Sequence, residues 1–382
     1  MKGKLIFVAY FFYPNKEVAA NRIRFWTNYL LESYPDIEPV VLTATPFSEE
    51  EKILPEQHFI PAVGKSTLGF LIKDQGLNWR KDLLSFFKEH RFENVLGVLF
   101  TGGPFMHFSI IPQLKKIYPC PVLIDFRDPF SHNDRFHNSP FKKRIKSIFE
   151  RGFIQSADRV ISVNHDGNRA LAGYDSNSPK FHVIPNGYDD VLLEKALKKS
   201  DIKKTSTGNT TVILTGKYYR DAPPFETFKA ITELNKEGDN FTFIHYGGAE
   251  DNRMFANDLN GIYEMGVCDY SEVAEGLAKA DIGVLITPGV AQNMPTKIFD
   301  YFGAELPILV ISSGRLKAGN VAEVTADYPL VKWCGNEKDE IKKTLKEMIQ
   351  LDLNIHFPMR ENYSRRNGLK KLIEILENVI DQ

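Results

Sequence analysis

The sequence is poor in several features that mark other classes of protein. Its three cysteines, Cys120, Cys268 and Cys334, are odd in number, far apart and in no metal-ligand spacing, which predicts neither a disulfide framework nor a zinc site and fits a reducing cytoplasm. A formal net charge of −1 gives no general attraction to nucleic acid. No apolar run is long enough to span a membrane. The first apolar run of the chain, residues 5–11, lacks a small-residue cleavage site. We therefore expect a β-strand there rather than a signal peptide.

Common nucleotide-binding and catalytic signatures are absent as well. No G-x-G-x-x-G string occurs, so the fingerprint of dinucleotide binding is missing. The string VGKST at residues 63–67 is similar to the end of a P-loop, but Phe59 occupies the position of the required first glycine. We find no convincing nucleophile–base pair, no low-complexity segment and no short-period repeat. The chemistry must therefore be sought in how the strands and helices alternate.

Apolar runs of strand length alternate with amphipathic helical patterns along both halves of the chain. This alternation predicts parallel sheets with helices on both faces. The expected strands are residues 5–11, 40–42, 95–100, 122–124, 159–163 and 182–184 in the first half, and 211–214, 241–246, 262–266, 282–286, 307–311 and 330–331 in the second. The expected helices are residues 21–31, 79–90, 108–117 and 141–154, then 225–236, 271–279, 296–303, 337–350 and 363–380.

Two doubly wound halves of similar size predict two Rossmann-like domains, because a chain of 382 residues is too long for one core. We place the first domain at residues 1–197 and a linker at residues 198–210, where the polar string KKSDIKKTSTGNT breaks the alternation. The second domain follows at residues 211–360, and residues 361–382 form a last amphipathic helix.

The segment DIGVLITPGVAQNMPTKIFDYFGAELPILVI, residues 281–311, is the most informative part of the chain. It predicts a strand, a loop, a helix that opens near Pro295, and a second strand. A helix that opens after a buried strand presents free N–H groups, and in open α/β sheets phosphate ligands bind there. Lys297 lies in its first turn, where a cation is unfavourable without an anionic partner. The alternative is a solvated lysine on an ordinary crossover helix.

This segment resembles the donor-site segment of GT-B glycosyltransferases, in particular those of the GT4 type. Such enzymes carry an E-x7-E pattern, whose positions fall here on Gln292 and Asp300, before a turn that ends at Pro307. The resemblance implies that Asp300 binds the ribose hydroxyls and that Gln292 lies near the sugar. Both residues depart from the usual glutamate.

The second half carries two more matches to that family. ILTGKYYRDAPP, residues 213–224, stands where GT4 enzymes hold the donor diphosphate with an Arg and a Lys; Lys217 replaces the Arg, Ala222 falls near the Lys, and Arg220 is the substitute cation. HYGGAED and MGVCDYSEV, at residues 245–251 and 265–273, match the strand ends that border the nucleobase. The donor-binding residues implied are Gly216, Lys217, Arg220, Gly247, Val267, Met294, Pro295, Thr296, Lys297 and Asp300.

The first half resembles the same family after several of its strands. In YFFYPNKEVAANRIR, residues 10–24, alanines stand in place of a glycine-rich loop, and the string TGGPFM, residues 101–106, follows another strand. The acceptor-side residues implied are Ala19, Ala20, Arg22, Gly102 and Gly103. The string DFRDPF places Arg127 and Asp128 at a strand end, toward the sugar and acceptor; the alternative is a self-satisfying Arg–Asp pair. ADRVISVNHD and VIPNGYD, between residues 157 and 189, match the family just before its linker.

The resemblance implies a fold of class α/β, of the GT-B type, with two Rossmann-like doubly wound domains facing a cleft and the last helix returning to the first domain. It further implies transfer of a sugar, with retained configuration, from a nucleotide sugar to a glycan or lipid-linked glycan in surface polysaccharide biosynthesis. We expect a UDP- or GDP-sugar as substrate, no cofactor and, since no D-x-D occurs, no metal. Arg127, Asp128, Lys217 and Gln292 are the candidate catalytic residues.

The expected location is the cytoplasm, with no nucleic-acid partner. The stretch at residues 141–153 is basic and amphipathic, which is typical of peripheral contact with the inner face of the plasma membrane. The alternative is a crossover helix with a solvated basic face. Two other functions stay open, a sugar-nucleotide 2-epimerase and a noncatalytic GT-B subunit that binds a glycan or partner.

Overall fold

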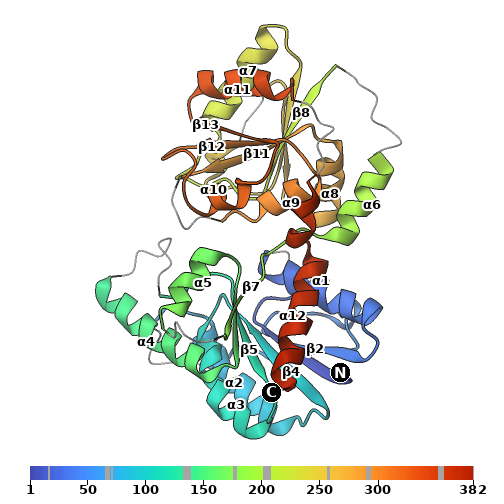
Figure 1. Cartoon of the computed structure of the whole chain (residues 1–382), viewed down its shortest axis with the longest axis vertical. Coiled ribbons are helices and arrows are strands. Elements are labelled where there is room, and N and C mark those ends of the chain that lie inside the picture. Colours follow the sequence, from blue (N-terminus) through green and yellow to red (C-terminus); the bar gives the residue numbers. More distant parts are fainter. Residues whose placement is uncertain are drawn as a thin grey trace. The chain divides into compact units, whose positions relative to one another are not determined.

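The computed structural model describes residues 1–15, 18–64, 69, 72–131, 139–174, 179–200, 208–255, 259–289, 294–351 and 357–381. The chain divides into two compact units (Figure 1). Unit 1 comprises Met1–Asn186 and Arg365–Gln382, and unit 2 comprises Gly187–Ser364.

Unit 1 is built on a parallel sheet of seven strands in the order β3-β2-β1-β4-β5-β6-β7. The central strands are buried on both faces, which explains their nearly continuous apolar runs. The strands are β1 Gly3–Ala9, β2 Ile37–Thr43, β3 Glu56–Phe59, β4 Val95–Thr101, β5 Val122–Phe126, β6 Arg159–Ser162 and β7 Phe181–Val183.

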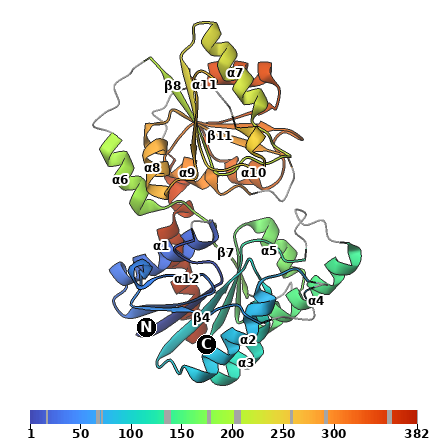
Figure 2. The same ribbon diagram turned by 180° about the vertical axis from the view of Figure 1, so that it is seen from behind.

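Helices cover both faces of the unit 1 sheet (Figures 1 and 2). Alternate residues of each strand enter two different cores: Ile6 and Val8 pack in the core that includes residues of α2, α3 and α4, and Leu5 and Phe7 pack in the core that includes α1 and α12. The helices are α1 Val18–Ser33, α2 Gly76–Glu89, α3 Ile111–Ile117, α4 Pro140–Ser156, α5 His165–Ala172 and α12 Arg365–Ile380, with 3₁₀ turns at Glu49–Glu51 and Met106–Ile110.

Unit 2 repeats this architecture on a parallel sheet of six strands in the order β10-β9-β8-β11-β12-β13. Its strands are β8 Thr210–Thr215, β9 Phe241–Tyr246, β10 Ile262–Gly266, β11 Ile282–Thr287, β12 Ile308–Ser312 and β13 Val331–Gly335. Its helices are α6 Asp190–Ser200, α7 Phe225–Lys236, α8 Tyr270–Lys279, α9 Lys297–Gly303, α10 Gly319–Thr325 and α11 Lys338–Met348, with 3₁₀ turns at Asn252–Met254 and Pro358–Tyr363. No helix in the described ranges is long and apolar enough to cross a membrane.

The predicted fold class, two doubly wound α/β domains, is confirmed. The sequence did not predict β3, α5, α6 or α10. The first division of the chain falls after Asn186, whereas the sequence placed it after residue 197, because Leu193 and Ala196 of α6 pack in a core of unit 2. Of the expected linker, residues 198–210, the part at 201–207 lies outside the described residues. The last helix, α12, is part of unit 1 and packs in its core through Leu369, Leu372 and Leu376.

One polar side chain in the core of unit 1 has no hydrogen-bond partner in the described part of the chain. Both ring nitrogens of His107 are buried, and the ring lies among Trp79, Phe100 and Phe108. Burial lowers the pKa of His107 to about 3, so the imidazole is neutral at pH 7. An unpaired buried polar group destabilises the folded state.

Replacing His107 by leucine should therefore stabilise the protein by about 1 kcal/mol at pH 7. The wild type should also lose about 2 kcal/mol of stability between pH 7 and pH 5, because the unfolded histidine takes up a proton below its ordinary pKa of 6.5 while the folded ring does not until about pH 3. The variant should lack this loss. Denaturant titrations at both pH values measure the two effects, with the exposed His165→Leu as the matched control. Parallel pH curves for wild type and His107→Leu would contradict the expectation.

Candidate functional site

The carboxyl ends of β8 and β11 mark the point in unit 2 where the strand order changes direction. In open α/β sheets such a switch point is where ligands bind. The two strands pair over only two positions, Ile282 with Val212 and Gly283 with Ile213. Beyond these positions the hydroxyl of Tyr301 joins them, because it accepts from the Thr215 N–H at 3.3 Å and donates to the Val284 carbonyl at 2.8 Å.

Tyr301 also fixes the position of Lys297. The two residues are one turn apart on α9, on the same side of the helix. A Cβ at Gly283 would lie 2.8 Å from the Tyr301 ring, so glycine is needed there for α9 to pack this closely. Since Tyr301 reaches Thr215, Lys297 lies over the next residue, Gly216: its Cε and Nζ are 3.5 Å and 3.8 Å from the position that a Cβ on Gly216 would take.

The Lys297 ammonium has no hydrogen-bond or ion-pair partner among the residues that the structure describes. The residue is half-buried, and the removal of water lowers its pKa to about 8. A cation that is partly dehydrated and unpaired is costly unless a ligand supplies the negative charge. Lys297 therefore has the environment of an anion-binding residue.

Two glycines bring the loops after β8 and β9 into direct backbone contact. A Cβ at Gly247 would lie 2.1 Å from the Gly216 carbonyl oxygen, which no side chain tolerates. The Gly216 N–H donates to the Tyr246 carbonyl at 2.7 Å, and the Tyr218 N–H donates to the Gly248 carbonyl at 2.9 Å. Gly216 itself adopts φ +83°, which favours glycine. Backbone hydrogen bonds thus join the two loops beneath Lys297.

The other cations predicted for this loop are more exposed. Lys217 is exposed and has no partner in the described ranges. Arg220 is 70% exposed and lies 4.0 Å from Asp251, which itself pairs with Arg253. Ala222, which falls near the position of the expected lysine, is buried in the core of unit 2. Lys217 and Lys297 are therefore the better placed cations for a ligand on Gly216.

The remaining donor-side residues predicted from the sequence lie around α9 and β10. Met294, Pro295 and Thr296 are half-buried and precede α9, which begins at Lys297. Asp300 accepts a hydrogen bond from the hydroxyl of Tyr270, the first residue of α8. Val267 is 72% exposed after β10. Gln292 lies outside the described residues.

In unit 1, Arg22 is in the interior rather than at a ligand surface. It is 1% exposed, its Nη2 donates to the Ile184 carbonyl at 3.1 Å, its Nη1 lies 3.5 Å from Asp125, and its guanidinium stacks on Trp26. The predicted contact with an acceptor is not supported by this position. Ala20 is buried too, and Ala19 belongs to α1 with a side chain outside the described part.

The predicted loop residues of unit 1 follow β4 and β5. Gly102 is buried, and a Cβ there would lie 2.4 Å from the Phe105 ring, whereas Gly103 is exposed at φ +80° with open space around it. Asp128 is exposed and Arg127 is half-buried. Of these residues, Gly103 and Asp128 are exposed at the surface and Arg127 is partly exposed.

Two carboxylates that sequence reasoning missed hold these loops of unit 1. Asp74 accepts from the N–H groups of Phe105 and Met106, at 2.9 Å and 3.0 Å, just beyond Gly103. Glu150 of α4 accepts from the Phe130 N–H at 2.6 Å, two residues after Asp128. Sequence gives no signal for either contact, because the bonded residues are 20 or more positions apart.

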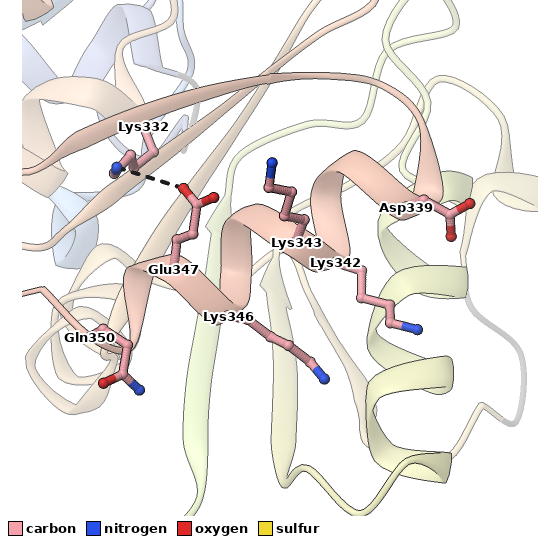
Figure 3. A pocket seen from close by; sticks show the side chains of 7 residues that line it. All are labelled: Lys332, Asp339, Lys342, Lys343, Lys346, Glu347 and Gln350. Carbon is pink, nitrogen blue, oxygen red and sulfur yellow. Dashed lines mark ion pairs between the residues drawn. The ribbon is translucent and has the colours of Figure 1, made fainter.

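A surface hollow elsewhere in unit 2 is not part of this site (Figure 3). None of its lining residues belongs to the loops after β8, β9 or β11. Its residues Lys342 and Lys346 pair with Glu233 of α7 and with Glu237, which directly follows that helix. Hydrogen bonds from Lys338 and Lys342 lower the pKa of Glu233, and hydrogen bonds from Lys342 and Lys346 lower that of Glu237. The lining residues are Lys332, Asp339, Lys342, Lys343, Lys346, Glu347 and Gln350. Among the described residues, no group of three or more His, Cys, Asp or Glu could hold a metal ion.

Comparison with known proteins agrees with this fold. Residues 35–191 match the family described as Glycosyltransferase Family 4. The fold is similar to a glycosyltransferase from Rickettsia africae (TM-score 0.69, 16% identity, 99% of each chain covered) and to Anabaena Alr3699/HepE in complex with UDP and glucose (TM-score 0.66, 13% identity, 98% of this chain and 99% of that one). It is also similar to a UDP-N-acetylglucosamine 2-epimerase from Listeria monocytogenes (TM-score 0.64, 13% identity, 100% and 97%).

No curated protein sequence shows significant similarity to the chain. The matched residues lie mostly in unit 1, without β1 and α12, and the structural similarity extends over both units. The chain therefore has the two-domain GT-B fold, and its residues 35–191 are similar to Glycosyltransferase Family 4.

Proposed function

We propose that the chain transfers a sugar from a nucleotide sugar to a glycan or lipid-linked glycan acceptor. The observation that carries this proposal is the unpaired, partly dehydrated ammonium of Lys297 over the bare backbone of Gly216. A diphosphate fits this place, because its oxygens would pair with Lys297 while the glycine leaves room for close approach. The UDP bound in the Anabaena neighbour supports a uridine nucleotide as the first donor to test.

The proposed chemistry needs charge stabilisation rather than an enzyme nucleophile. The bond between the anomeric carbon and the diphosphate oxygen breaks, and a bond from that carbon to the acceptor oxygen forms on the same face. The leaving phosphate takes the proton of the acceptor hydroxyl. Lys217 and Lys297 would neutralise the charge that develops on the diphosphate, which is an effective means of catalysis when the cations are already in place.

We assign the other predicted residues to roles that follow the family resemblance. Asp300 would bind the ribose hydroxyls, with Tyr270 orienting its carboxylate, and Val267 would lie beside the base. Gln292 would lie near the sugar, and Gly103, Arg127 and Asp128 of unit 1 would meet sugar and acceptor. We propose no metal in this reaction and no cofactor beyond the nucleotide sugar.

A lipid-linked acceptor is supported by helix α4. Phe141 and Ile148 of this helix are 63% and 66% exposed, and the same helix carries the exposed Lys143 and Arg144. Apolar side chains beside basic ones favour the surface of an anionic membrane. We therefore propose that the protein works at the inner face of the plasma membrane, in surface polysaccharide biosynthesis.

Thermal stabilisation by UDP, GDP, ADP and dTDP, each with a chelator present, tests the proposal. We expect one nucleotide to raise the melting temperature, by an amount equivalent to about 2.7 kcal/mol at 100 times its Kd. Stabilisation in the presence of chelator would also show that binding needs no metal. If none of the four nucleotides stabilises the protein, the noncatalytic alternative is favoured, in which unit 2 has lost its donor site.

The structural similarity to the Listeria epimerase makes 2-epimerisation the second candidate function. The two activities differ in what they need. An epimerase would convert its UDP-sugar into the isomer that differs at C2, without an acceptor and without net release of UDP, whereas a transferase would release UDP mainly when an acceptor is present. Incubation of the donor with and without acceptor, followed by chromatography of the nucleotides, separates them.

A further inference from the structure

A buried histidine lies directly beneath the proposed diphosphate surface. His245, on β9, is fully buried, and its Nε2 is 2.7 Å from the Gly216 carbonyl oxygen. Its Nδ1 is 2.6 Å from Glu264 Oε2 on the neighbouring strand β10. The ring of Tyr218 stacks on the imidazole at 3.7 Å, and the Tyr218 hydroxyl donates to the other oxygen of Glu264 at 3.4 Å.

These partners fix the tautomer of the ring. A carbonyl oxygen can only accept, so Nε2 must carry the hydrogen that bonds Gly216. Nδ1 then shares a proton with Glu264, whichever of the two groups holds it. The imidazole is fully buried and can neither rotate nor flip without breaking two hydrogen bonds.

The orientation of the Gly216–Lys217 peptide follows from this bond. In a trans peptide the C=O and the N–H point in opposite directions. Because the Gly216 carbonyl points to the buried His245, the N–H of Lys217 points away from it, and no acceptor takes that N–H in the described part of the chain. A carbonyl that accepts a hydrogen bond also makes the N–H of the same peptide a stronger donor.

We propose that His245, fixed by Glu264, is a positioning residue that holds the Lys217 N–H toward the diphosphate of the donor. This inference rests on the proposed function and adds a group to it that touches no substrate. The diphosphate would thus meet two cations and one oriented backbone N–H. Val267 and Asp300, assigned to the nucleoside, are not held by His245.

The test compares a nucleoside diphosphate with its monophosphate in the full chain. His245→Phe keeps a ring against Tyr218 but removes the donor, and His245→Gln restores an N–H near the position of Nε2. We expect His245→Phe to weaken UDP about tenfold to a hundredfold and UMP less than about twofold, and His245→Gln to recover most of the loss. Titration calorimetry gives both constants; if another nucleotide stabilises the wild type, its diphosphate and monophosphate replace UDP and UMP.

Two further variants make the result specific. Phe243→Leu alters a buried residue on the same face of β9, two positions before His245, and should leave the ratio of the two affinities unchanged. Glu264→Ala removes the group that fixes the ring from a strand at the edge of the sheet, and should weaken UDP selectively even if His245→Phe does not fold.

Equal weakening of UDP and UMP, no weakening, or a glutamine variant as weak as the phenylalanine variant would overturn the role of His245 and leave the proposed function intact. A wild type that binds none of the nucleotides would overturn both.

Discussion

Alanine at position 297 should lower kcat/KM for sugar transfer by about a hundredfold or more, because one cation is lost from the place where the leaving diphosphate gains charge. The fold should survive, since the Lys297 ammonium has no partner in the described chain whose loss would leave a charge buried. Steady-state kinetics and a melting curve measure both quantities. Lys236→Ala, an exposed lysine at the end of α7, is the matched control. Full activity of Lys297→Ala would sink the assignment of the donor site.

The pH dependence gives the same lysine a second signature. Burial lowers the pKa of Lys297 to about 8, so the side chain is a cation below that pH and a neutral amine above it. Nucleotide affinity should therefore be full at pH 7 and fall as the pH rises beyond about 8, with the midpoint moved upward by the bound anion. Lys297→Arg should hold its affinity to higher pH, because arginine stays protonated. An affinity that is flat from pH 7 to pH 9.5 in the wild type would contradict this.

Alanine in place of Gly247 should separate the two loops that form the proposed diphosphate surface. The new Cβ would lie 2.1 Å from the Gly216 carbonyl oxygen and 2.5 Å from its carbon, both of them backbone atoms that cannot move alone. We expect a loss of about 1–3 kcal/mol of stability, from the cost of overpacking. Nucleotide binding should become undetectable, because Gly216 and Lys217 move with the loop.

The neighbouring residue provides the control for that substitution. A Cβ at Gly248 would meet only Val267 Cγ2, at an ordinary 3.6 Å. Gly248→Ala should therefore stay within about 0.5 kcal/mol of the wild type and bind nucleotide normally. Chemical denaturation and calorimetry of the pair distinguish a steric effect at Gly247 from a general intolerance of this loop to alanine.

The sequence predicted the parts of the structure that depend on patterns among neighbouring residues. The segment around Lys297 was found because two buried apolar strands flank a short helix, and the cation in its first turn is visible without any tertiary information. The alternation of strands and helices gave the fold class for the same reason.

The errors arise where distant partners decide the outcome. Arg22 looks like a ligand residue because it follows a loop, yet Asp125 and Ile184, more than 100 positions away, draw it into the interior. The domain boundary was missed although a signal was present: Asp189 accepts from the Leu192 N–H, which is a helix-capping pattern before α6. The burial of His245 could also have been predicted, because it lies two positions after Phe243 and four after Phe241 on the buried face of β9. A histidine on such a face needs hydrogen-bond partners.

The link between β8 and β11 depends on a single side chain, Tyr301. The two strands share only a short ladder, and a side-chain hydroxyl completes the connection. Backbone hydrogen bonds between the strands do not depend on the side chains. The hydroxyl, by contrast, is lost when tyrosine is replaced by phenylalanine. The link between α9 and the two strands can thus change independently of the strands themselves. Phenylalanine at position 301 would keep both strands and remove the hydroxyl that joins Thr215 to Val284.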